Sequence, residues 1–386
     1  MKVGAGVCTE QDPLEAGACA AEDAAAGLGQ APVDVAVVFA SGLHLGAPEA
    51  TLEAVHEVLA PRALIGCGAA GVLGGGRELE SGTGLAVWAA SLEGAGGATA
   101  FHASLTEEES GALLGGLPAL AGTSGAIILA DPYSFPTDAA LSVLGANAPA
   151  VPLLGGIASA RTPEGGAALF FGEEIRDDGA VGITFEGVEM LPCVSQGAAP
   201  LGREVTITGA EDNMIHELAG RPALETIETI ISELTPRERV LIAGGMLIGI
   251  VIDAGKPEYE QGDFLVRGLL GADPETGSVA VGAPVSTGQV VRLHARDAAS
   301  ADEDLHRALR LRVDAMAGSA PAGALVFSCN GRGSAMFGLP DHDATVVKEE
   351  LGGAPAAGFF AAGEIGPVGG RSFLHGFTAT VAVFPG

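Results

Sequence analysis

Three stretches of this chain show the same order of apolar and polar residues. Each has an apolar strand, a loop, an amphipathic helix, a second strand with a glycine-rich loop, and a further apolar strand. In the first stretch the strand runs from Val33 to Ala40, and the helix that Pro48 opens carries Leu52 and Val55 on one face, as expected of a helix with one buried side. The same elements recur at 126–130, 137–144, 151–159 and 180–185, and again at 324–328, 344–351, 357–370 and 373–384.

The spacing of these elements predicts an internal structural repeat. Equivalent points lie 27 residues apart from Phe39 to Gly66, 26 apart from Leu129 to Gly155, and 31 apart from Phe327 to Gly358. Recurrence at a nearly constant period is typical of a duplicated supersecondary unit.

The segment between the second and third stretches follows a different pattern. The run from Val240 to Ile252 is apolar throughout and predicts one buried strand with a Gly-Gly kink. A capping box of Ser300 and Glu303 is expected to open a long helix. At the start of the chain, residues 1–31 are small and acidic, which predicts a frayed end or a short peripheral helix. Apolar spacing and turn residues further predict helices at 222–234 and 300–316, and two strands around a Pro/Gly turn at 262–282.

These patterns together predict an α/β protein of the mixed α+β kind. The strands are apolar on both faces and the helices are amphipathic, so the helices must cover sheets whose inner faces are also buried. We therefore expect two packed mixed β-sheets flanked by outer helices, built partly from repeated strand-loop-helix-strand-hairpin units.

Charge and cysteine content narrow the partners and the compartment. The chain is acidic, with 19 Lys and Arg against 48 Asp and Glu, a net charge of −29. Nucleic acid and anionic membranes would be repelled, so neither is expected as a partner. The longest uncharged apolar run has 13 residues, too few to span a bilayer. Five cysteines at irregular spacing without a C-x-x-C motif indicate reduced thiols and a cytoplasmic protein.

Motifs for cofactors and metals are weak or missing in the sequence. Gly66 to Gly71 matches G-x-G-x-x-G after a strand, but the glycines that follow make a helix there implausible. The chain has no P-loop motif and no H-x-x-x-H pair. Asp341-His342-Asp343 is interpreted as a solvated helix entry. No cofactor and no metal are therefore expected.

The closing part of the chain concentrates the candidate chemistry. Cys329 follows a buried strand, and Arg332 lies three residues further on. A cation and loop amides can lower the pKa of a thiol and make it reactive, but cysteine at a strand end is also a common small apolar side chain; both interpretations stay open. Glu364 lies among apolar residues and needs a cationic partner, for which Arg332 or Arg371 would serve.

A ligand pocket is expected where the glycine-rich loops converge. Asp263 and Arg267 have even spacing on a strand and form a second candidate charge pair. Backbone amides, guanidinium groups and carboxylates suit a small zwitterionic or carboxylate ligand. The candidate ligand-binding residues are Cys329, Asn330, Arg332, Glu364, Arg371, His375, Asp263 and Arg267.

Five runs of the sequence resemble FIST (F-box and intracellular signal transduction) proteins, in which a FIST N domain precedes a FIST C domain. The similarity extends from about Ala31 to Phe384, and the runs are 64–80, 262–282, 288–298, 326–333 and 357–370. The resemblance implies an N-terminal segment at 1–30, a FIST N domain at 31–220 and a FIST C domain at 221–386. It also implies an intracellular sensory module for small ligands such as amino acids. These 386 residues include no kinase, cyclase or F-box region, so a separate signalling protein is the expected partner.

Three classes of function remain open at this point. The first is ligand sensing, with an amino acid or small carboxylate metabolite as the ligand. The second is an enzyme with Cys329 as nucleophile and His375 or Glu364 as base. The third is a scaffold that only binds another protein. The family brings no agreed catalytic residues, so catalysis is the less favoured of these.

Overall fold

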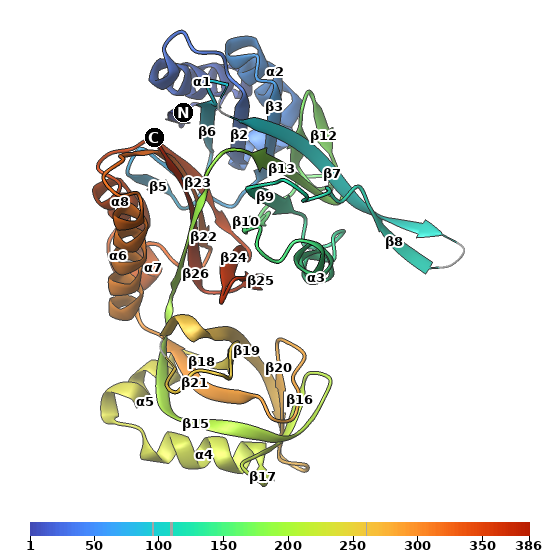
Figure 1. The fold of residues 1–386 in the computed structure, drawn as a ribbon, viewed down its shortest axis with the longest axis vertical. Helices are drawn as coiled ribbons and strands as arrows, with labels where there is room; N and C mark the ends of the chain where they lie inside the picture. The colour runs from blue at the N-terminus through green and yellow to red at the C-terminus, as the bar shows by residue number, and fades with distance from the viewer. Residues whose placement is uncertain (95, 109–110, 260) are drawn as a thin grey trace. The chain divides into compact units, whose positions relative to one another are not determined.

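The chain forms two compact units in a computed structural model that describes residues 1–94, 96–108, 111–259 and 261–386 (Figure 1). The second unit comprises Ser195–Asp304 and His375–Phe377. The first unit comprises the rest of the described chain, Met1–Val194, Leu305–Leu374 and Thr378–Gly386. Each unit has its own sheets, helices and apolar core.

The first unit contains three mixed sheets among its described residues. The first sheet has the order β1 (Lys2–Cys8), β6 (Gly84–Ser91), β2 (Val35–Ser41), β3 (Ala63–Gly68), β11 (Leu169–Phe171) and β12 (Glu174–Arg176). The second has the order β25 (Arg371–His375), β24 (Glu364–Val368), β10 (Leu153–Ile157), β9 (Gly125–Ala130), β13 (Ala180–Glu186), β7 (Gly97–Glu108) and β8 (Gly111–Gly115). The third has the order β14 (Leu191–Gln196), β26 (Thr378–Pro385), β22 (Pro321–Cys329), β23 (Ala356–Ala361), β4 (Val72–Gly74) and β5 (Arg77–Leu79).

The three sheets share one pattern of strand pairing. In each, a central strand pairs in parallel with the next strand of its own stretch, as β2 with β3, β9 with β10 and β22 with β23. On its other side each central strand pairs antiparallel with a later strand, β6, β13 or β26. The three stretches singled out by their apolar pattern thus have the same connectivity.

The hairpins are exchanged between the sheets. Hairpin β4–β5 follows β3 along the chain but pairs with β23 of the third sheet. Hairpin β11–β12 follows β10 but pairs with β3 of the first sheet. β24, the first strand of the third hairpin, follows β23 but pairs with β10 of the second sheet. Each sheet is therefore completed by a segment from another stretch.

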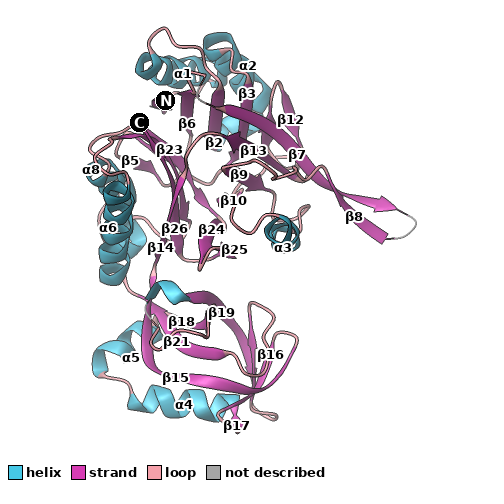
Figure 2. Cartoon of the chain, in the orientation of Figure 1, coloured by secondary structure: helices cyan, strands magenta, loops and turns pink. Residues whose placement is uncertain are grey.

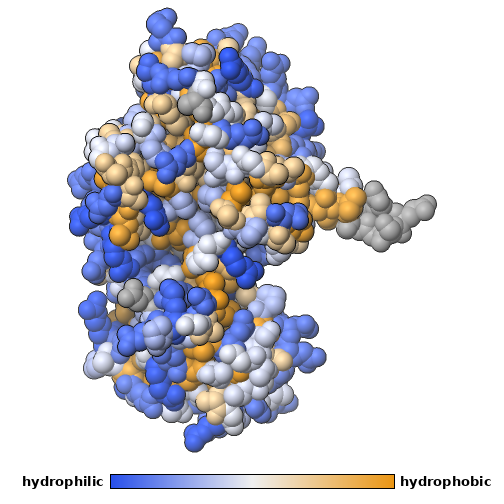
Figure 3. Space-filling view, in the orientation of Figure 1, coloured by the Kyte–Doolittle hydropathy of each residue, from blue (hydrophilic) through white to orange (hydrophobic). Residues whose placement is uncertain are grey.

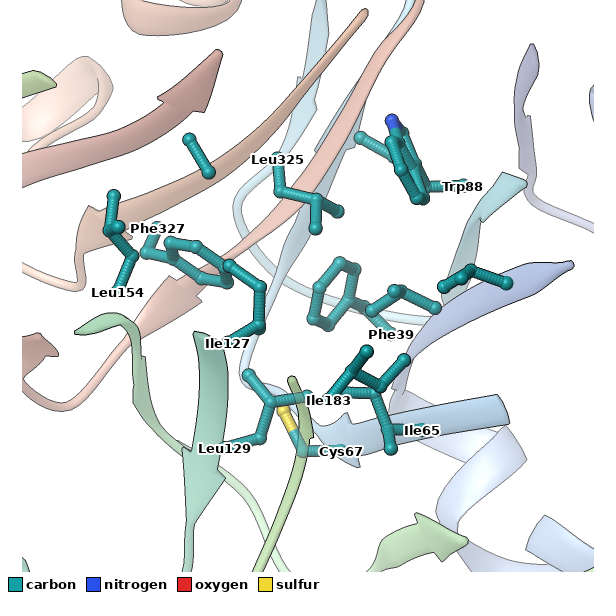
Figure 4. Close-up of a cluster of buried hydrophobic side chains, with 14 of the residues drawn as sticks. Phe39, Ile65, Cys67, Trp88, Ile127, Leu129, Leu154, Ile183, Leu325 and Phe327 are labelled. Carbon is teal, nitrogen blue, oxygen red and sulfur yellow. The ribbon is translucent and has the colours of Figure 1, made fainter. Parts of the chain in front are cut away.

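Apolar side chains from the inner faces of all three sheets meet in one core. Figure 4 shows Phe39 and Trp88 of the first sheet near Leu325 and Phe327 of the third. The ring of Phe39 stacks on Phe359 with centroids 5.0 Å apart. Burial of so much apolar surface is the main stabilising contribution to such a core.

Helices cover the outer faces of the three sheets (Figure 2). These helices are α1 (Pro13–Leu28) and α2 (Pro48–Leu59) on the first sheet, α3 (Thr137–Asn147) on the second, and α6 (Ala298–Ala315) and α8 (His342–Glu350) on the third. Short helices η1 (Gly42–Gly46) and α7 (Ser334–Phe337) lie in loops. On the face drawn in Figure 3, hydrophilic side chains cover much of each unit.

The second unit is built on one sheet with helices packed on one face. Its core contains Ile227 and Ile230 of α4 against Ile248 and Leu293 of the sheet. The sheet has the order β15 (Ala198–Glu211), β21 (Val290–Arg296), β18 (Met246–Val251), β19 (Phe264–Asp273), β20 (Ser278–Val281), β16 (Met214–Leu218) and β17 (Arg221–Pro222). The helices are α4 (Ala223–Glu233), α5 (Pro236–Ala243) and the single turn η2 (Gln261–Asp263).

The α/β class is confirmed, whereas several details differ from the sequence prediction. The described residues form four sheets rather than two. The start of the chain is neither frayed nor only a helix, since β1 pairs along its whole length with β6 and α1 packs behind it. Helix α6 begins at Ala298, and Ser300 Oγ donates to the Asp297 carboxylate 2.8 Å away.

The prediction of one strand from Val240 to Ile252 is wrong. The run divides between the end of α5 and strand β18, and the Val240 side chain is 72% exposed. A capping box decides the helix: Thr235 Oγ1 accepts from Glu238 N, and the Glu238 carboxylate accepts from Thr235 N. These bonds satisfy amide groups that a helix start leaves free.

Because hairpins are exchanged, we expect that neither half of the chain folds alone. A fragment of residues 1–221 contains β4 and β10 but lacks β23 and β24, with which they pair. A fragment of residues 222–386 contains β23 and β24 but lacks β4 and β10. Each fragment expressed separately should show no cooperative thermal transition by circular dichroism, and co-expression of both should restore one. Cooperative melting of the 1–221 fragment alone would contradict this expectation.

Candidate functional site

The candidate site lies where β22 ends and its loop begins, in the first unit. The strand is fully buried over its last seven residues and stops at Cys329, whose carbonyl accepts from Arg332 N at 2.8 Å in a tight turn. Asn330 N donates to the Ala361 carbonyl of β23 at 2.9 Å. Gly333 follows with φ of 95°, a conformation that side chains other than glycine rarely adopt. This turn directs the Arg332 side chain inward, and Arg332 is only 3% exposed.

Arg332 forms a buried bidentate ion pair with Asp343 of α8. Its Nε and Nη2 donate to the two carboxylate oxygens at 2.6 and 2.9 Å. Ser328 Oγ donates to Oδ2 at 2.7 Å, and His342 Nδ1 lies 2.9 Å from Oδ1. Burial acts to raise the pKa of Asp343, but the Arg332 charge and these hydrogen bonds outweigh it and hold that pKa well below its usual range.

Asp343 is a residue that sequence reasoning missed. The interpretation of Asp341-His342-Asp343 as a solvated helix entry is wrong for two of the three, because His342 is 7% and Asp343 1% exposed. The sequence suggests Arg332 as a partner for Glu364, whereas both bidentate hydrogen bonds of Arg332 go to Asp343. The missed signal is the buried cation itself, since a buried guanidinium needs a paired carboxylate.

An aromatic side chain and a hairpin cover this pair. The Arg332 guanidinium lies 5.1 Å from the ring centre of Phe337, and that ring stacks on His342. Glu80, just beyond β5, accepts from Ser334 N at 2.7 Å and Ser334 Oγ at 2.8 Å. Through these hydrogen bonds the exchanged hairpin β4–β5 holds α7 over the Arg332 guanidinium.

Glu78 of the same hairpin caps the start of α8. Its carboxylate accepts from Ala344 N at 3.0 Å, and its own N–H donates to Asp341 Oδ1 at 2.6 Å. Burial raises the pKa of Glu78 to about 7, and the negative charge of Asp343 acts in the same direction.

Glu364 is a fully buried carboxyl group at the start of β24. Its Oε2 accepts from Thr378 N at 3.0 Å and from Thr378 Oγ1 at 2.7 Å. Burial raises the pKa of Glu364 to about 8, although the Thr378 bonds, the Arg332 charge and the Cys329 thiol all act to lower it. At neutral pH the group is therefore mainly a neutral carboxylic acid, able to donate a hydrogen bond.

The two other sheets provide an internal comparison for Glu364. Its backbone pairs with Gly156 of β10, and the equivalent residues are Leu169, paired with Cys67, and Val72, paired with Phe359. Leu169 and Val72 are both fully buried in the central apolar core. At this position the first and third sheets have an aliphatic side chain, whereas the second sheet has the carboxyl group of Glu364.

Thr380 shows the same contrast. It pairs with Phe327, and its equivalents Ala86 and Val181 pair with Phe39 and Leu129. Ala86 and Val181 belong to the apolar core, whereas Thr380 brings a hydroxyl group into full burial. The corner where β22, β24 and β26 meet is therefore polar at two positions that are apolar elsewhere in the fold.

Three buried polar atoms in this corner have no hydrogen-bond partner within the described part of the chain. They are Nη1 of Arg332, Oε1 of Glu364 and Oγ1 of Thr380. Buried polar groups are usually satisfied, so a cluster of unpaired ones points to a place where a polar partner can bind.

Comparison with known protein families identifies two domains in this chain. Residues 34–221 match the FIST N domain and residues 223–367 match the FIST C domain. The chain belongs to the FIST family. An uncharacterized protein of Mycobacterium bovis is 41% identical over 389 residues, which cover 100% of this chain and 99% of that protein. An uncharacterized protein of Mycobacterium tuberculosis is 42% identical over 385 residues, covering 100% of both chains. FIST domains are associated with signal transduction and small-ligand sensing.

The FIST assignment does not say which side chains hold a ligand, so the position of each candidate matters. Cys329 is 9% exposed, and Gly331 N donates to its sulfur at 3.4 Å. Asn330 and Arg371 are exposed, and the Arg371 guanidinium lies over the ring of Phe373. His375 is buried at the end of β25. Of the candidates, three interact with one another through charge or hydrogen bonds: Cys329, Arg332 and Glu364.

Asp263 and Arg267 belong to the second unit of the FIST protein. Asp263 ends the turn η2 and forms an ion pair with Lys256. Arg267 lies in β19, and its Nη1 donates to the Val266 carbonyl at 3.2 Å. Within the described residues no three His, Cys, Asp or Glu side chains are grouped as metal ligands. No described helix is long and apolar enough to cross a membrane.

Replacing Asp343 by Asn should destabilise this FIST protein strongly. The substitution leaves the Arg332 charge buried without a counter-charge, which costs about 3–5 kcal/mol of unfolding free energy. Urea denaturation followed by fluorescence or circular dichroism measures the change. Glu233→Gln is the control: the side chains of Glu233 and its partner Arg203 are 55% and 53% exposed, and an exposed pair contributes at most about 1 kcal/mol. Equal losses in both variants would contradict a buried, energetically important pair.

Replacing Glu364 by Gln should change how stability depends on pH. The folded pKa of Glu364, about 8, lies above its unfolded value of about 4.3. The folded state therefore binds the proton more tightly, and the stabilisation present below about pH 4 is lost progressively as the pH rises to about 8. The amide of the Glu364→Gln variant does not titrate in this range, so this loss is confined to the wild type.

We expect the melting temperature of the variant, relative to wild type, to rise between about pH 5 and pH 8 and then to level off. Glu78→Gln serves as a comparison, because its effect should level off near pH 7, the raised pKa of Glu78. A constant difference across the whole range would show that Glu364 is ionised in the folded protein.

Proposed function

We propose that this FIST protein is an intracellular sensory module whose first unit binds a small carboxylate, such as an amino acid, in the polar corner at the end of β22. The ligand would contact Arg332, Glu364 and Cys329. The family association with small-ligand sensing supports the class of function, and the geometry of the corner supports the chemistry.

One observation carries this proposal: Glu364 stands where the two equivalent positions hold Leu169 and Val72. Burying a carboxyl group with an unpaired oxygen costs free energy that an aliphatic side chain would not. Because the fold accepts an aliphatic side chain at both equivalent positions, packing at this position does not require a carboxyl group, and the Thr378 hydrogen bonds occupy only Oε2. A binding role would account for it.

The unpaired atoms favour an anionic ligand group. Arg332 has donors left on Nη1, and neutral Glu364 can donate from Oε1. Two donors in the same corner suit a carboxylate, which accepts through both oxygens. The Thr380 hydroxyl group could accept a hydrogen bond from the ammonium group of an amino acid. Arg371, Asn330, His375 and the second-unit residues Asp263 and Arg267 are not needed for this minimal site.

The cysteine-enzyme alternative has less support from the same geometry. A general base must be unprotonated at working pH, whereas the pKa of Glu364 is raised to about 8. A neutral acid cannot take up the thiol proton, and its own proton is available for a ligand. We therefore propose that Cys329 contacts the ligand and does not act as a nucleophile. A separate signalling protein would receive the signal when the ligand binds.

Thermal-shift measurements with amino acids and small mono- and dicarboxylates test the proposal. A ligand at about 100 times its Kd stabilises the folded protein by about 2.7 kcal/mol, which raises the melting temperature by several degrees. Glu364→Leu copies the residue of the first sheet; it should still fold, less stably because the Thr378 amide and hydroxyl lose their acceptor, and it should lose the shift. Arg371→Ala changes an exposed residue and should keep it.

The affinity should also depend on pH. Ionised Glu364 would repel a carboxylate, so binding should weaken up to about tenfold per pH unit above about pH 8. If no compound of the panel shifts the melting temperature, or if Glu364→Leu keeps the full shift, the carboxylate site is not in this corner.

A further inference from the structure

We propose that Cys8 and Cys19 form a redox pair, which a peroxide converts into a disulfide bond between β1 and α1. Cys8 is the last residue of β1, and Cys19 lies in the middle of α1. Cys8 belongs to the apolar cluster between the first sheet and its helices, and Cys19 packs against that cluster. This pair is separate from the polar corner at β22 and does not depend on the proposed ligand.

Strand β1 packs closely on α1. A Cβ atom added to Gly4 would lie 1.8 Å from the Ala24 carbonyl oxygen, and one added to Gly6 would lie 2.1 Å from the Ala20 oxygen. Glycine at both positions therefore lets the strand approach the helix backbone directly. Two residues along the strand correspond to about one helical turn in the opposite direction.

The same register between β1 and α1 brings the two cysteines together. Alternate residues of a strand point to one face, so Cys8 continues the face of Gly4 and Gly6 toward α1. One further turn toward the start of the helix brings residues 16–19 opposite Cys8. Cys19 lies within that turn, in agreement with its place beside the cluster that contains Cys8.

The side chains of Cys19 and Cys8 also interact with each other. The Cys19 thiol hydrogen-bonds to Cys8, which raises the pKa of Cys19 to about 12, and burial and the charges of Cys8, Asp23 and Glu10 act in the same direction. Cys8 is buried and Cys19 is partly exposed. An oxidant can therefore reach one sulfur from solvent, with the second thiol already beside it.

The other three cysteines are less accessible. All five are described and all are reduced, but Cys67, Cys193 and Cys329 are buried. Cys67 lies in the central core, and Cys193 lies in the cluster beneath α6 and α8. Cys19 is thus the most accessible thiol of the chain, and the thiol it contacts is Cys8.

The reaction balances with peroxide as the oxidant. The Cys19 thiol first loses its proton, a step that its raised pKa makes slow at neutral pH and faster at alkaline pH. The thiolate attacks a peroxide oxygen, the O–O bond breaks, and sulfenic acid and hydroxide form; the hydroxide takes up a proton. The neighbouring thiol then attacks the sulfenic sulfur, forming the S–S bond and releasing water. Two thiols and one hydrogen peroxide give one disulfide and two waters. The two sulfurs are oxidised and the peroxide oxygens are reduced.

The test is oxidation of the full-length protein, first reduced and freed of reductant, with hydrogen peroxide. Digestion without reductant and mass spectrometry should find the Cys8 and Cys19 peptides linked. Free thiols, counted after denaturation, should fall from five to three. Linking residues 8 and 19 restricts the unfolded chain, so the oxidised protein should melt several degrees higher than the reduced protein, and dithiothreitol should reverse the shift.

Matched variants separate this pair from general oxidation. Cys8→Ala and Cys19→Ala should each keep their four remaining free thiols and show no upward shift, whereas Cys67→Ala should still lose two. The mapping on the unmodified protein needs no variant and stands if one fails to fold. A link through Cys67, Cys193 or Cys329, a disulfide between two chains, or an oxidised protein that melts lower would each overturn the proposal.

Discussion

Each sheet of the first unit ends in a hairpin supplied by a distant part of the chain, and this exchange holds both the apolar core and the polar corner together. Hairpin β4–β5 contributes Val72 to the core, Glu78 to the start of α8 and Glu80 to α7. β24, exchanged in the same way, contributes Glu364. The residues around Arg332 therefore come from both family domains, although they lie in one compact unit.

The polar corner is an exception among three sheets that have the same strand pairing. Equivalent paired positions recur in the three sheets, and in the other copies they are apolar where they face the core, as at Ala86, Leu169 and Val72. Glu364 and Thr380 interrupt that pattern at a single corner. Sheets with the same pairing can be compared position by position, and this comparison singles out Glu364 and Thr380 as polar side chains that packing does not require.

The local elements could be predicted because their signals lie within short windows of sequence. Strands β2, β9 and β22 and helices α2 and α3 follow from apolar spacing alone. The hairpin exchange could not be predicted, because the apolar faces of β4 and β11 match any of the three sheets equally well. The run from Val240 to Ile252 was predicted wrongly because a uniformly apolar run has no period that distinguishes helix from strand. The signal that decides for a helix is the capping box just before the run.

In the candidate site, Cys329, Arg332 and Glu364 stand out because glycines and apolar neighbours surround them in sequence. Asp343 does not, since an acidic residue at a helix start is usually solvated and favourable there. Its burial depends on the loop that carries Phe337 and on the hairpin that carries Glu80.

The charges buried in the polar corner couple ligand binding to the protonation of Glu364. One guanidinium and two carboxyl groups are buried together, and the ion pair of Arg332 with Asp343 already neutralises the guanidinium. A second ionised carboxylate would leave a net negative charge in a medium of low dielectric constant, so Glu364 keeps its proton. A zwitterionic amino acid would add no net charge to the corner, and its carboxylate beside Glu364 would raise the pKa of Glu364 further. In such a site the proton on Glu364 lets the corner accept the carboxylate of a ligand whose own ammonium group balances it.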